Sequence, residues 1–121
     1  MLTGTCHCGS LGWTFDGMPK SATACNCTLC RRYGVLWIYD YEGERIKISG
    51  PSAVYTRKDT VKPALEIHFC GICGCTTHWR ILETFAATHP EMPPRMGINM
   101  RLFEPEAVDA VEVRFPDGRS W

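Results

Sequence analysis

The sequence lacks several features that would indicate common functional classes. Lys and Arg number 13 and Asp and Glu also number 13, so the formal net charge is zero, whereas a general nucleic-acid binder usually carries clustered basic charge. No apolar run approaches the ~18–20 residues of a membrane helix, and the N-terminal sequence MLTGTCHCGS has no apolar signal-peptide centre. We therefore expect a cytoplasmic protein without a membrane partner, and nucleic acid is not favoured as a partner.

Helical patterns are also scarce, and short alternating segments typical of β-strands take their place. One-turn helices are expected only at Thr28–Tyr33 and Glu104–Ala110. The sequence predicts a single all-β domain over residues 1–121, with several short antiparallel strands. The expected strands are Ser10–Phe15, Arg45–Ser49, Ala53–Arg57, Leu65–Phe69, Thr76–Arg80, Arg95–Leu102 and Ala110–Phe115.

Cysteine is the residue type that the chain has in excess, with eight in 121 residues. The cysteines occur in three clusters, CHC, CNCTLC and CGICGC. A disulfide framework usually accompanies an export signal, and bridges within C-x-C or C-x-x-C segments would close strained loops. The same spacings direct two sulfurs toward one metal ion, so we favour metal binding. Zn²⁺ is the expected ion, and iron in a rubredoxin-like site is the alternative.

The spacing of the cysteines suggests two ligand sets. Cys70-x-x-Cys73-Gly resembles a zinc-ribbon knuckle, and Cys6-x-Cys8-Gly is a matching pair, so together they predict a site with four cysteine ligands. Thioredoxin-like redox chemistry at Cys70 and Cys73 is a weaker alternative, because no helix is predicted after them.

The middle cluster, CNCTLC, predicts a second site. Its cysteines, Cys25, Cys27 and Cys30, offer three sulfurs from one loop. Three protein ligands with an open fourth position are the catalytic arrangement for zinc. Cys75 is the rival occupant of that fourth position. An open second site would be only partly occupied by metal.

These motifs together resemble a known family. CHCG, CNCTLCRR, FCGICGCTTHW and the later GINMRLFEP resemble the glutathione-dependent formaldehyde-activating enzyme family, which also contains centromere protein V. The resemblance spans Gly4 to Val113. It implies a tent-like all-β zinc fold with two Zn²⁺ ions per chain, and the reversible joining of glutathione and formaldehyde to S-hydroxymethylglutathione, a carbon–sulfur lyase reaction. The implied ligands are Cys6, Cys8, Cys70 and Cys73 for a structural zinc, and Cys25, Cys27 and Cys30 for the zinc at the catalytic site.

The chemistry of three thiolates agrees with a thiol substrate. They donate enough charge to make zinc a weak Lewis acid, which suits a fourth, soft thiolate ligand better than hydroxide. A small thiol such as glutathione is therefore the expected partner. Arg31 and Arg32 follow the cluster and either offset its negative charge or are solvated surface residues. Two other functions stay open: a non-catalytic zinc-binding interaction module, and a thiol-based enzyme similar to methionine sulfoxide reductases, which Cys75 invites.

The remaining polar and aromatic residues receive mostly structural interpretations. Asn26 is expected to shape its loop, and Asn99 to lie on the polar face of a strand. Arg101 is either a surface residue on that strand or a partner for a glutathione carboxylate. The histidines and tryptophans are expected to have structural or surface roles: His7 at the surface, His68 and His78 hydrogen-bonded in the structure, and Trp13, Trp37 and Trp79 in the core.

Overall fold

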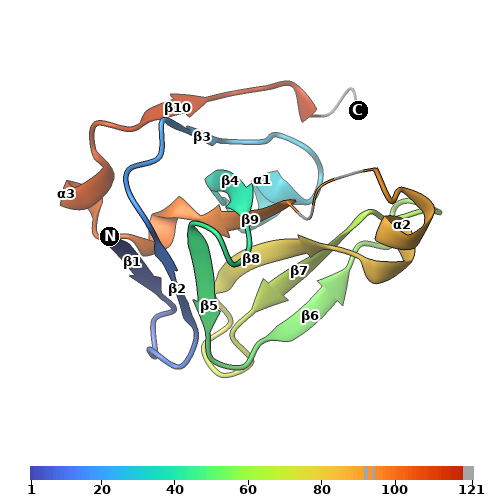
Figure 1. The fold of residues 1–121 in the computed structure, drawn as a ribbon, viewed down its shortest axis with the longest axis horizontal. Helices are drawn as coiled ribbons and strands as arrows, with labels where there is room; N and C mark the ends of the chain where they lie inside the picture. Colours follow the sequence, from blue (N-terminus) through green and yellow to red (C-terminus); the bar gives the residue numbers. More distant parts are fainter. Residues whose placement is uncertain (92, 94, 119–121) are drawn as a thin grey trace.

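A computed structural model describes residues 1–91, 93 and 95–118, and within them ten short strands form two β-sheets (Figure 1). Its strands are β1 Leu2–Thr5, β2 Gly12–Phe15, β3 Ser21–Thr23, β4 Trp37–Tyr41, β5 Ile46–Ser49, β6 Ala53–Thr56, β7 Leu65–Phe69, β8 Thr76–Ile81, β9 Arg95–Asn99 and β10 Glu112–Arg114. Its helices are α1 Cys30–Tyr33, α2 Glu83–Thr88, the 3₁₀ turn η1 Met100–Leu102 and α3 Pro105–Val108. The prediction of an all-β fold with little helix is confirmed.

The two sheets differ in size. The smaller has the order β1-β2-β5, and the larger has the order β10-β3-β4-β9-β8-β7-β6. All neighbours pair antiparallel except β10 and β3, which run parallel along one edge (Figure 1). That parallel pair brings the C-terminal segment beside the chain that leads into the CNCTLC loop.

The main core lies between the two sheets. Trp13 and Phe15 of β2 and Ile46 of β5 pack against residues of the larger sheet such as Ile38 and Ile98. Phe103 closes this core from the segment after η1, with its ring edge-on to Trp13 at 3.9 Å between centroids. The expectation that Trp13 lies in the core is confirmed, since only 1% of it is exposed.

A second apolar cluster lies on the other face of the larger sheet. It contains Val35, Trp37, Ile67 and Trp79, so Trp37 and Trp79 are also core residues as expected. Alternation along the strands explains the arrangement, because neighbouring side chains of a strand point to opposite faces. This face carries the CNCTLC loop and the cleft described below.

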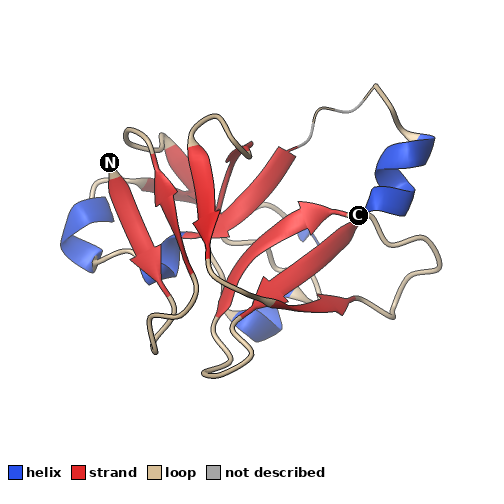
Figure 2. Cartoon of the chain, turned by 60° about the horizontal axis from the view of Figure 1, so that its bottom comes forward, coloured by secondary structure: helices blue, strands red, loops and turns tan. Residues whose placement is uncertain are grey.

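Several element predictions need correction. The strands β1, β3 and β4 and the helix α2 were not predicted, since each is short and carries no strong alternating or helical pattern. The expected strand Arg95–Leu102 ends at Asn99, because the Asn99 side chain accepts a hydrogen bond from the backbone N–H of Arg101 and begins a 3₁₀ turn. Figure 2 shows α2 standing beyond the ends of the strands.

The other predicted elements are present: Leu65–Phe69 has the expected bounds, the strand expected at Thr76–Arg80 extends to Ile81, and the rest are shorter than expected. The first expected strand begins at Gly12, and the last covers only Glu112–Arg114. The helical turns are Cys30–Tyr33 and Pro105–Val108. None of the helices in the described part of the chain is long and apolar enough to cross a membrane. The single domain over residues 1–121 stays a prediction, and residues 92, 94 and 119–121 of that range lie outside the described part.

Candidate metal centres

The first cysteine cluster joins two turns that are far apart in the sequence. Cys6 and Cys8 lie in the turn between β1 and β2, whereas Cys70 and Cys73 lie in the turn between β7 and β8. The four Sγ atoms lie within 4.8 Å of one another. The arrangement therefore links the small sheet to the large one.

The spacing of these sulfurs fits a tetrahedral zinc site. The Sγ atom of Cys8 lies 3.6 Å from that of Cys6 and 3.6 Å from that of Cys70. A tetrahedron with Zn–S bonds of ~2.3 Å has sulfur–sulfur edges of about 3.8 Å. The sulfurs are thus already close to the positions that a zinc ion requires.

The backbone of both turns is arranged to stabilise thiolates. Cys70 Sγ accepts hydrogen bonds from the N–H groups of Ile72 at 3.4 Å and Cys73 at 3.5 Å, and Cys6 Sγ accepts one from Leu11 at 3.3 Å. The backbone N–H of Cys73, with the Ser10 hydroxyl and the Ile72 N–H, lowers the pKa of Cys70 to about 5. Such donors favour the charged form of a thiol, which is the form that binds metal.

Glycines permit the two turns to take this shape. Gly9 and Gly74 follow the second cysteine of each pair, and both have φ of +82°, in the left-handed region. In each turn the glycine N–H also bonds to the carbonyl of the first cysteine: Gly9 to Cys6 at 3.1 Å and Gly74 to Cys70 at 2.9 Å. A side chain at either position would strain the turn.

Cys75 lies beside this first cluster. It packs with Cys6, Cys70 and Cys73, and its thiol interacts with the backbone N–H of His7. Cys75 is absent from both groups of close sulfurs among the described residues. The structure thus places the rival ligand with the first cluster, and its predicted role at the second stays a prediction.

The second cluster lies in the loop between β3 and α1. The Sγ atoms of Cys25, Cys27 and Cys30 lie within 4.8 Å of one another. Backbone N–H groups of the loop bond to two of them, from Cys27 to Cys25 Sγ at 3.5 Å and from Cys30 to Cys27 Sγ at 3.3 Å. Trp37 adds a side-chain donor, with its indole Nε1 3.4 Å from Cys30 Sγ.

The thiols of the second cluster differ in acidity. Burial raises the pKa of Cys30 to about 12. Burial also opposes ionisation of Cys27, but the backbone N–H and thiol of Cys30 outweigh it and lower the pKa of Cys27. A bound cation would favour the thiolate form of all three, because metal binding displaces the thiol protons.

The C-terminal segment covers one side of the second cluster. Gly118 is buried, and a Cβ atom there would lie 2.5 Å from Cys25 Sγ. Asn26 donates a hydrogen bond from Nδ2 to Asp117 Oδ1 at 3.2 Å, which ties the loop to this segment. The expectation that Asn26 shapes its loop agrees with this contact.

The second cluster opens onto a cleft of about 1240 Å³. Apolar side chains of the larger sheet and the C-terminal segment form much of its wall, and arginines from four separate parts of the chain lie around it. The apolar lining includes Leu65, Ile67, Trp79 and Phe115, and the arginines are Arg31, Arg57, Arg95 and Arg114. Cys75 is not part of the lining formed by the described residues.

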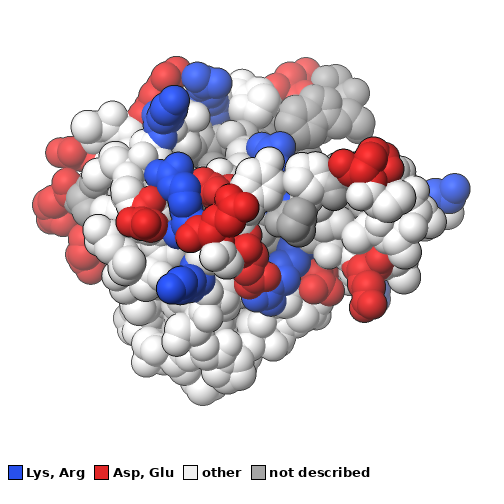
Figure 3. Space-filling view, viewed as in Figure 1, with Lys and Arg blue, Asp and Glu red and all other residues white. Residues whose placement is uncertain are grey.

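The surroundings of the two clusters differ in charge. The turns that carry the first cluster, residues 6–11 and 70–75, contain no Lys, Arg, Asp or Glu, and the lower end of the molecule in Figure 3 is correspondingly uncharged. The arginines of the cleft surround only the second cluster. Positive charge near one cluster alone favours the binding of an anion there.

Sequence reasoning identified part of the cleft and missed the rest. Arg31 lines it, whereas Arg32 bonds back to Thr28 and lines a smaller neighbouring hollow. Arg101 donates from Nε to the Gly34 carbonyl and is not among the described residues of the cleft lining. Arg57 and Phe115 were missed, because their sequence neighbourhoods carry no metal-site pattern and only folding brings them to the cluster.

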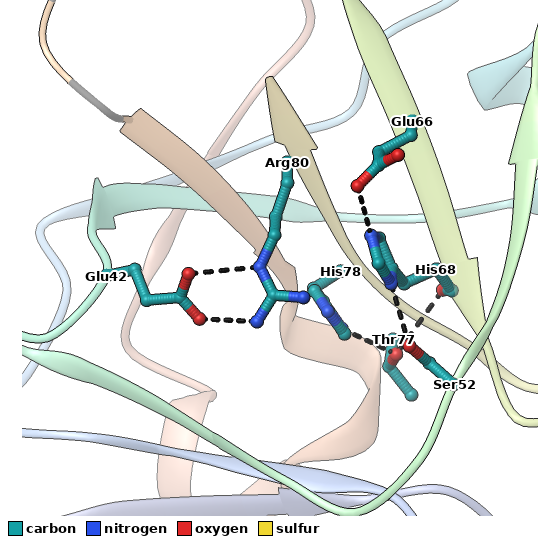
Figure 4. Close-up of polar contacts among 7 residues, drawn as sticks. All are labelled: Glu42, Ser52, Glu66, His68, Thr77, His78 and Arg80. Atoms are coloured by element: carbon teal, nitrogen blue, oxygen red, sulfur yellow. Dashed lines mark hydrogen bonds and ion pairs between the residues drawn. The ribbon is translucent and has the colours of Figure 1, made fainter. Parts of the chain in front are cut away.

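His68 and His78 are not among the described residues that line the cleft, and Figure 4 shows them side by side on neighbouring strands. His68 bonds to Ser52 Oγ at 2.7 Å and to Glu66 Oε1 at 3.0 Å, and it stacks on His78 with centroids 4.4 Å apart. His78 Nδ1 bonds to Thr77 Oγ1 at 2.8 Å. Both are structural residues, as expected, and His7 is exposed at the surface, also as expected.

The two cysteine clusters on an all-β scaffold define a small cysteine-rich protein with two candidate metal centres. The chain belongs to the glutathione-dependent formaldehyde-activating enzyme family, whose model matches residues 1–106. The fold is similar to that in a crystal structure of a Rhodobacter sphaeroides protein, with a TM-score of 0.65 and 21% sequence identity. That similarity covers 93% of this chain and 100% of the other. No curated protein matches the chain.

Proposed function

We propose that this chain is a zinc-dependent carbon–sulfur lyase that interconverts S-hydroxymethylglutathione with glutathione and formaldehyde. The observation that carries the proposal is the opening of the Cys25–Cys27–Cys30 cluster onto the cleft. Membership of a family described as glutathione-dependent and formaldehyde-activating supports the choice of substrates.

The two metal sites have different roles in this proposal. Cys6, Cys8, Cys70 and Cys73 hold a structural zinc with a complete set of protein ligands. Cys25, Cys27 and Cys30 would hold the second ion, and a zinc ion there would lower the pKa of a substrate thiol so that the thiol is deprotonated at neutral pH. The placement of Cys75 beside the first cluster supports a fourth position that is available to substrate.

The rest of the cleft binds and orients the reactants. Arg31, Arg95 and Arg114 at the cleft offer positive charge to the carboxylates of glutathione. Arg95 is itself ordered against the ring of Tyr39, with 4.6 Å between its Cζ atom and the ring centre. The apolar wall reduces access of water, and holding thiol and aldehyde together supplies much of the acceleration.

The experiment that tests this function is exchange spectroscopy by NMR. Glutathione and formaldehyde combine in solution, so the measured quantity is the rate of exchange between free glutathione and the adduct with and without protein. We expect the zinc-loaded protein to accelerate exchange at least tenfold, and a Cys27→Ser variant to lose that acceleration. Exchange at the uncatalysed rate with fully loaded wild-type protein would contradict the proposal.

A further inference from the structure

Arg57 is held in the cleft in an unusually defined position. Arg57 directly follows β6, thirty residues along the chain from Cys27, and only 26% of its side chain is exposed. The guanidinium binds Asp59 through two parallel hydrogen bonds, from Nε to Oδ1 at 2.6 Å and from Nη2 to Oδ2 at 2.7 Å. A bidentate pair of this kind fixes the plane of the guanidinium as well as its position.

The pair with Asp59 leaves part of the guanidinium for other acceptors, and the side chain of Cys27 already interacts with it there. Arginine has five N–H donors, and the pair with Asp59 occupies two of them. Arg57 and Asp59 line the cleft together with Cys25, Cys27 and Cys30. The hydrogen bonds with Asp59 raise the pKa of Arg57 despite its partial burial, and the charge of Cys27 and a hydrogen bond with the Cys27 side chain add to this.

Asp59 argues against a simple role for Arg57 as a counterion of the cysteines. A carboxylate beside the guanidinium cancels much of the positive charge that would offset thiolates. It leaves the remaining N–H donors in place, because the two parallel hydrogen bonds hold the plane of the guanidinium. The pair therefore presents aimed N–H donors at the cluster, which is the arrangement that stabilises a developing oxyanion.

We propose that Arg57, oriented by Asp59, donates hydrogen bonds to the oxygen of the aldehyde that reacts at the Cys25–Cys27–Cys30 cluster. This inference rests on the proposed function. In the forward direction the substrate thiolate attacks the carbonyl carbon, a carbon–sulfur bond forms, and the π electron pair moves to the oxygen. The resulting alkoxide, bonded to Arg57, then takes a proton from water. In reverse, the hydroxyl of the adduct loses its proton to water, and the alkoxide then re-forms the carbonyl and expels the thiolate, with no net oxidation or reduction.

The first test compares Arg57→Gln with a matched control. Arg80 forms the same kind of bidentate pair, with Glu42, on the opposite face of the sheet (Figure 4). We expect Arg57→Gln to lower kcat for glutathione–formaldehyde exchange about a hundredfold, with the KM for glutathione changed less than about threefold. Arg80→Gln is expected to retain wild-type kcat and KM. Asp59→Asn, which releases the guanidinium, is expected to fall between them.

The second test measures binding without turnover. S-(2-hydroxyethyl)glutathione carries a hydroxyl near the position of the reacting oxygen, and S-propylglutathione replaces it with methyl. By calorimetry, we expect wild-type protein to prefer the hydroxyl compound about tenfold, because a hydrogen bond to a charged donor is strong. Arg57→Gln should lose that preference, and Arg57→Lys should retain part of it.

The outcomes separate this inference from the function on which it rests. Wild-type protein that does not accelerate exchange contradicts the proposed function and with it the inference. Active wild-type protein, with Arg57→Gln matching Arg80→Gln in kcat and in the preference between the two analogues, overturns the inference alone. Zinc content and melting temperature of each variant show whether it is folded. If Arg57→Gln is not folded, Arg57→Lys and Asp59→Asn supply the test.

Discussion

Replacing Cys73 with serine tests whether the first cluster holds the two sheets together. Cys73 is one of four close sulfurs that join the β1–β2 turn to the β7–β8 turn, and Cys8 and Cys70 are 62 residues apart. Serine keeps the size of the side chain but removes the thiolate. Cys75→Ser is the matched control, because Cys75 lies in the same turn and beside the same cluster, yet outside the group of four.

The size of the effect follows from the energy of metal binding. A structural zinc contributes ~10–16 kcal/mol of apparent binding free energy in small domains, whereas a domain of this size is stable by only ~5–15 kcal/mol. If four sulfurs share the metal energy equally, one is worth roughly 3 kcal/mol. At about 4 °C per kcal/mol for 121 residues, we expect the melting midpoint to fall by about 10 °C or more.

Circular dichroism with a zinc count for each variant provides the assay. We expect Cys73→Ser to lose one zinc per chain to a chelator at a lower chelator concentration than the wild type, and to melt earlier and less cooperatively. Cys75→Ser should keep both the metal content and the midpoint of the wild type. A Cys73→Ser protein that melts with the wild type would refute the structural role of the cluster, as would equal damage from both variants.

Three further predictions follow from the fold and the second site. A Cβ atom at Gly97 would overlap the indole of Trp79. Gly97→Ala should therefore lower the free energy of unfolding by about 1–3 kcal/mol in urea titrations. An unchanged urea midpoint would show that Gly97 and Trp79 are not tightly packed. Burial, together with the nearby charges of His68 and Arg80, lowers the pKa of His78 to about 3. The unfolded chain therefore binds more protons at this residue, and the stability that neutral His78 contributes is complete above pH 6.5 and declines as the pH falls toward 3. Between pH 7 and pH 5 the wild type should lose about 2 kcal/mol more than His78→Gln, and parallel losses would contradict the assignment. Trp37→Phe removes the hydrogen-bond donor to Cys30 Sγ. In chelator competition it should lower the metal affinity of the second site about tenfold and leave the affinity of the first site unchanged. Equal affinities of the second site in variant and wild type would show that the donor has no role.

The cysteine clusters could be predicted because their chemistry is local. C-x-C and C-x-x-C spacing followed by glycine constrains a turn and its sulfurs within a few residues. The grouping of the first four cysteines required only the assumption that two similar knuckles meet. The structure brings those four sulfurs together in one group and the sulfurs of Cys25, Cys27 and Cys30 together in a second, separate group.

The cleft could not be predicted because its residues meet only through sheet pairing. Phe115 and Gly118 reach the second cluster because β10 pairs in parallel with β3, and Arg57 reaches it because β6 lies in the same sheet. No local pattern marks any of them. The missed strands have the same cause, since β1 and β3 gain their stability from neighbours in the sheet more than from their own sequences.

The position of Cys75 shows where local reasoning reaches its limit. By sequence it lies two residues beyond Cys73, and spacing alone allowed it to be the fourth ligand of the second site. In the folded chain its backbone carbonyl accepts a hydrogen bond from Cys70 N–H at 2.9 Å, which closes the knuckle and keeps Cys75 beside the first cluster.

X-ray absorption at the zinc edge, before and after adding glutathione, tests most directly whether the second site is open to a thiol. In fully loaded protein, one site with four cysteines and one with three predict about 3.5 sulfur neighbours per zinc on average. Glutathione should raise the average to about four, and Cys75→Ser should behave in the same way. Four sulfurs per zinc from the protein alone, unchanged by glutathione, would contradict the account.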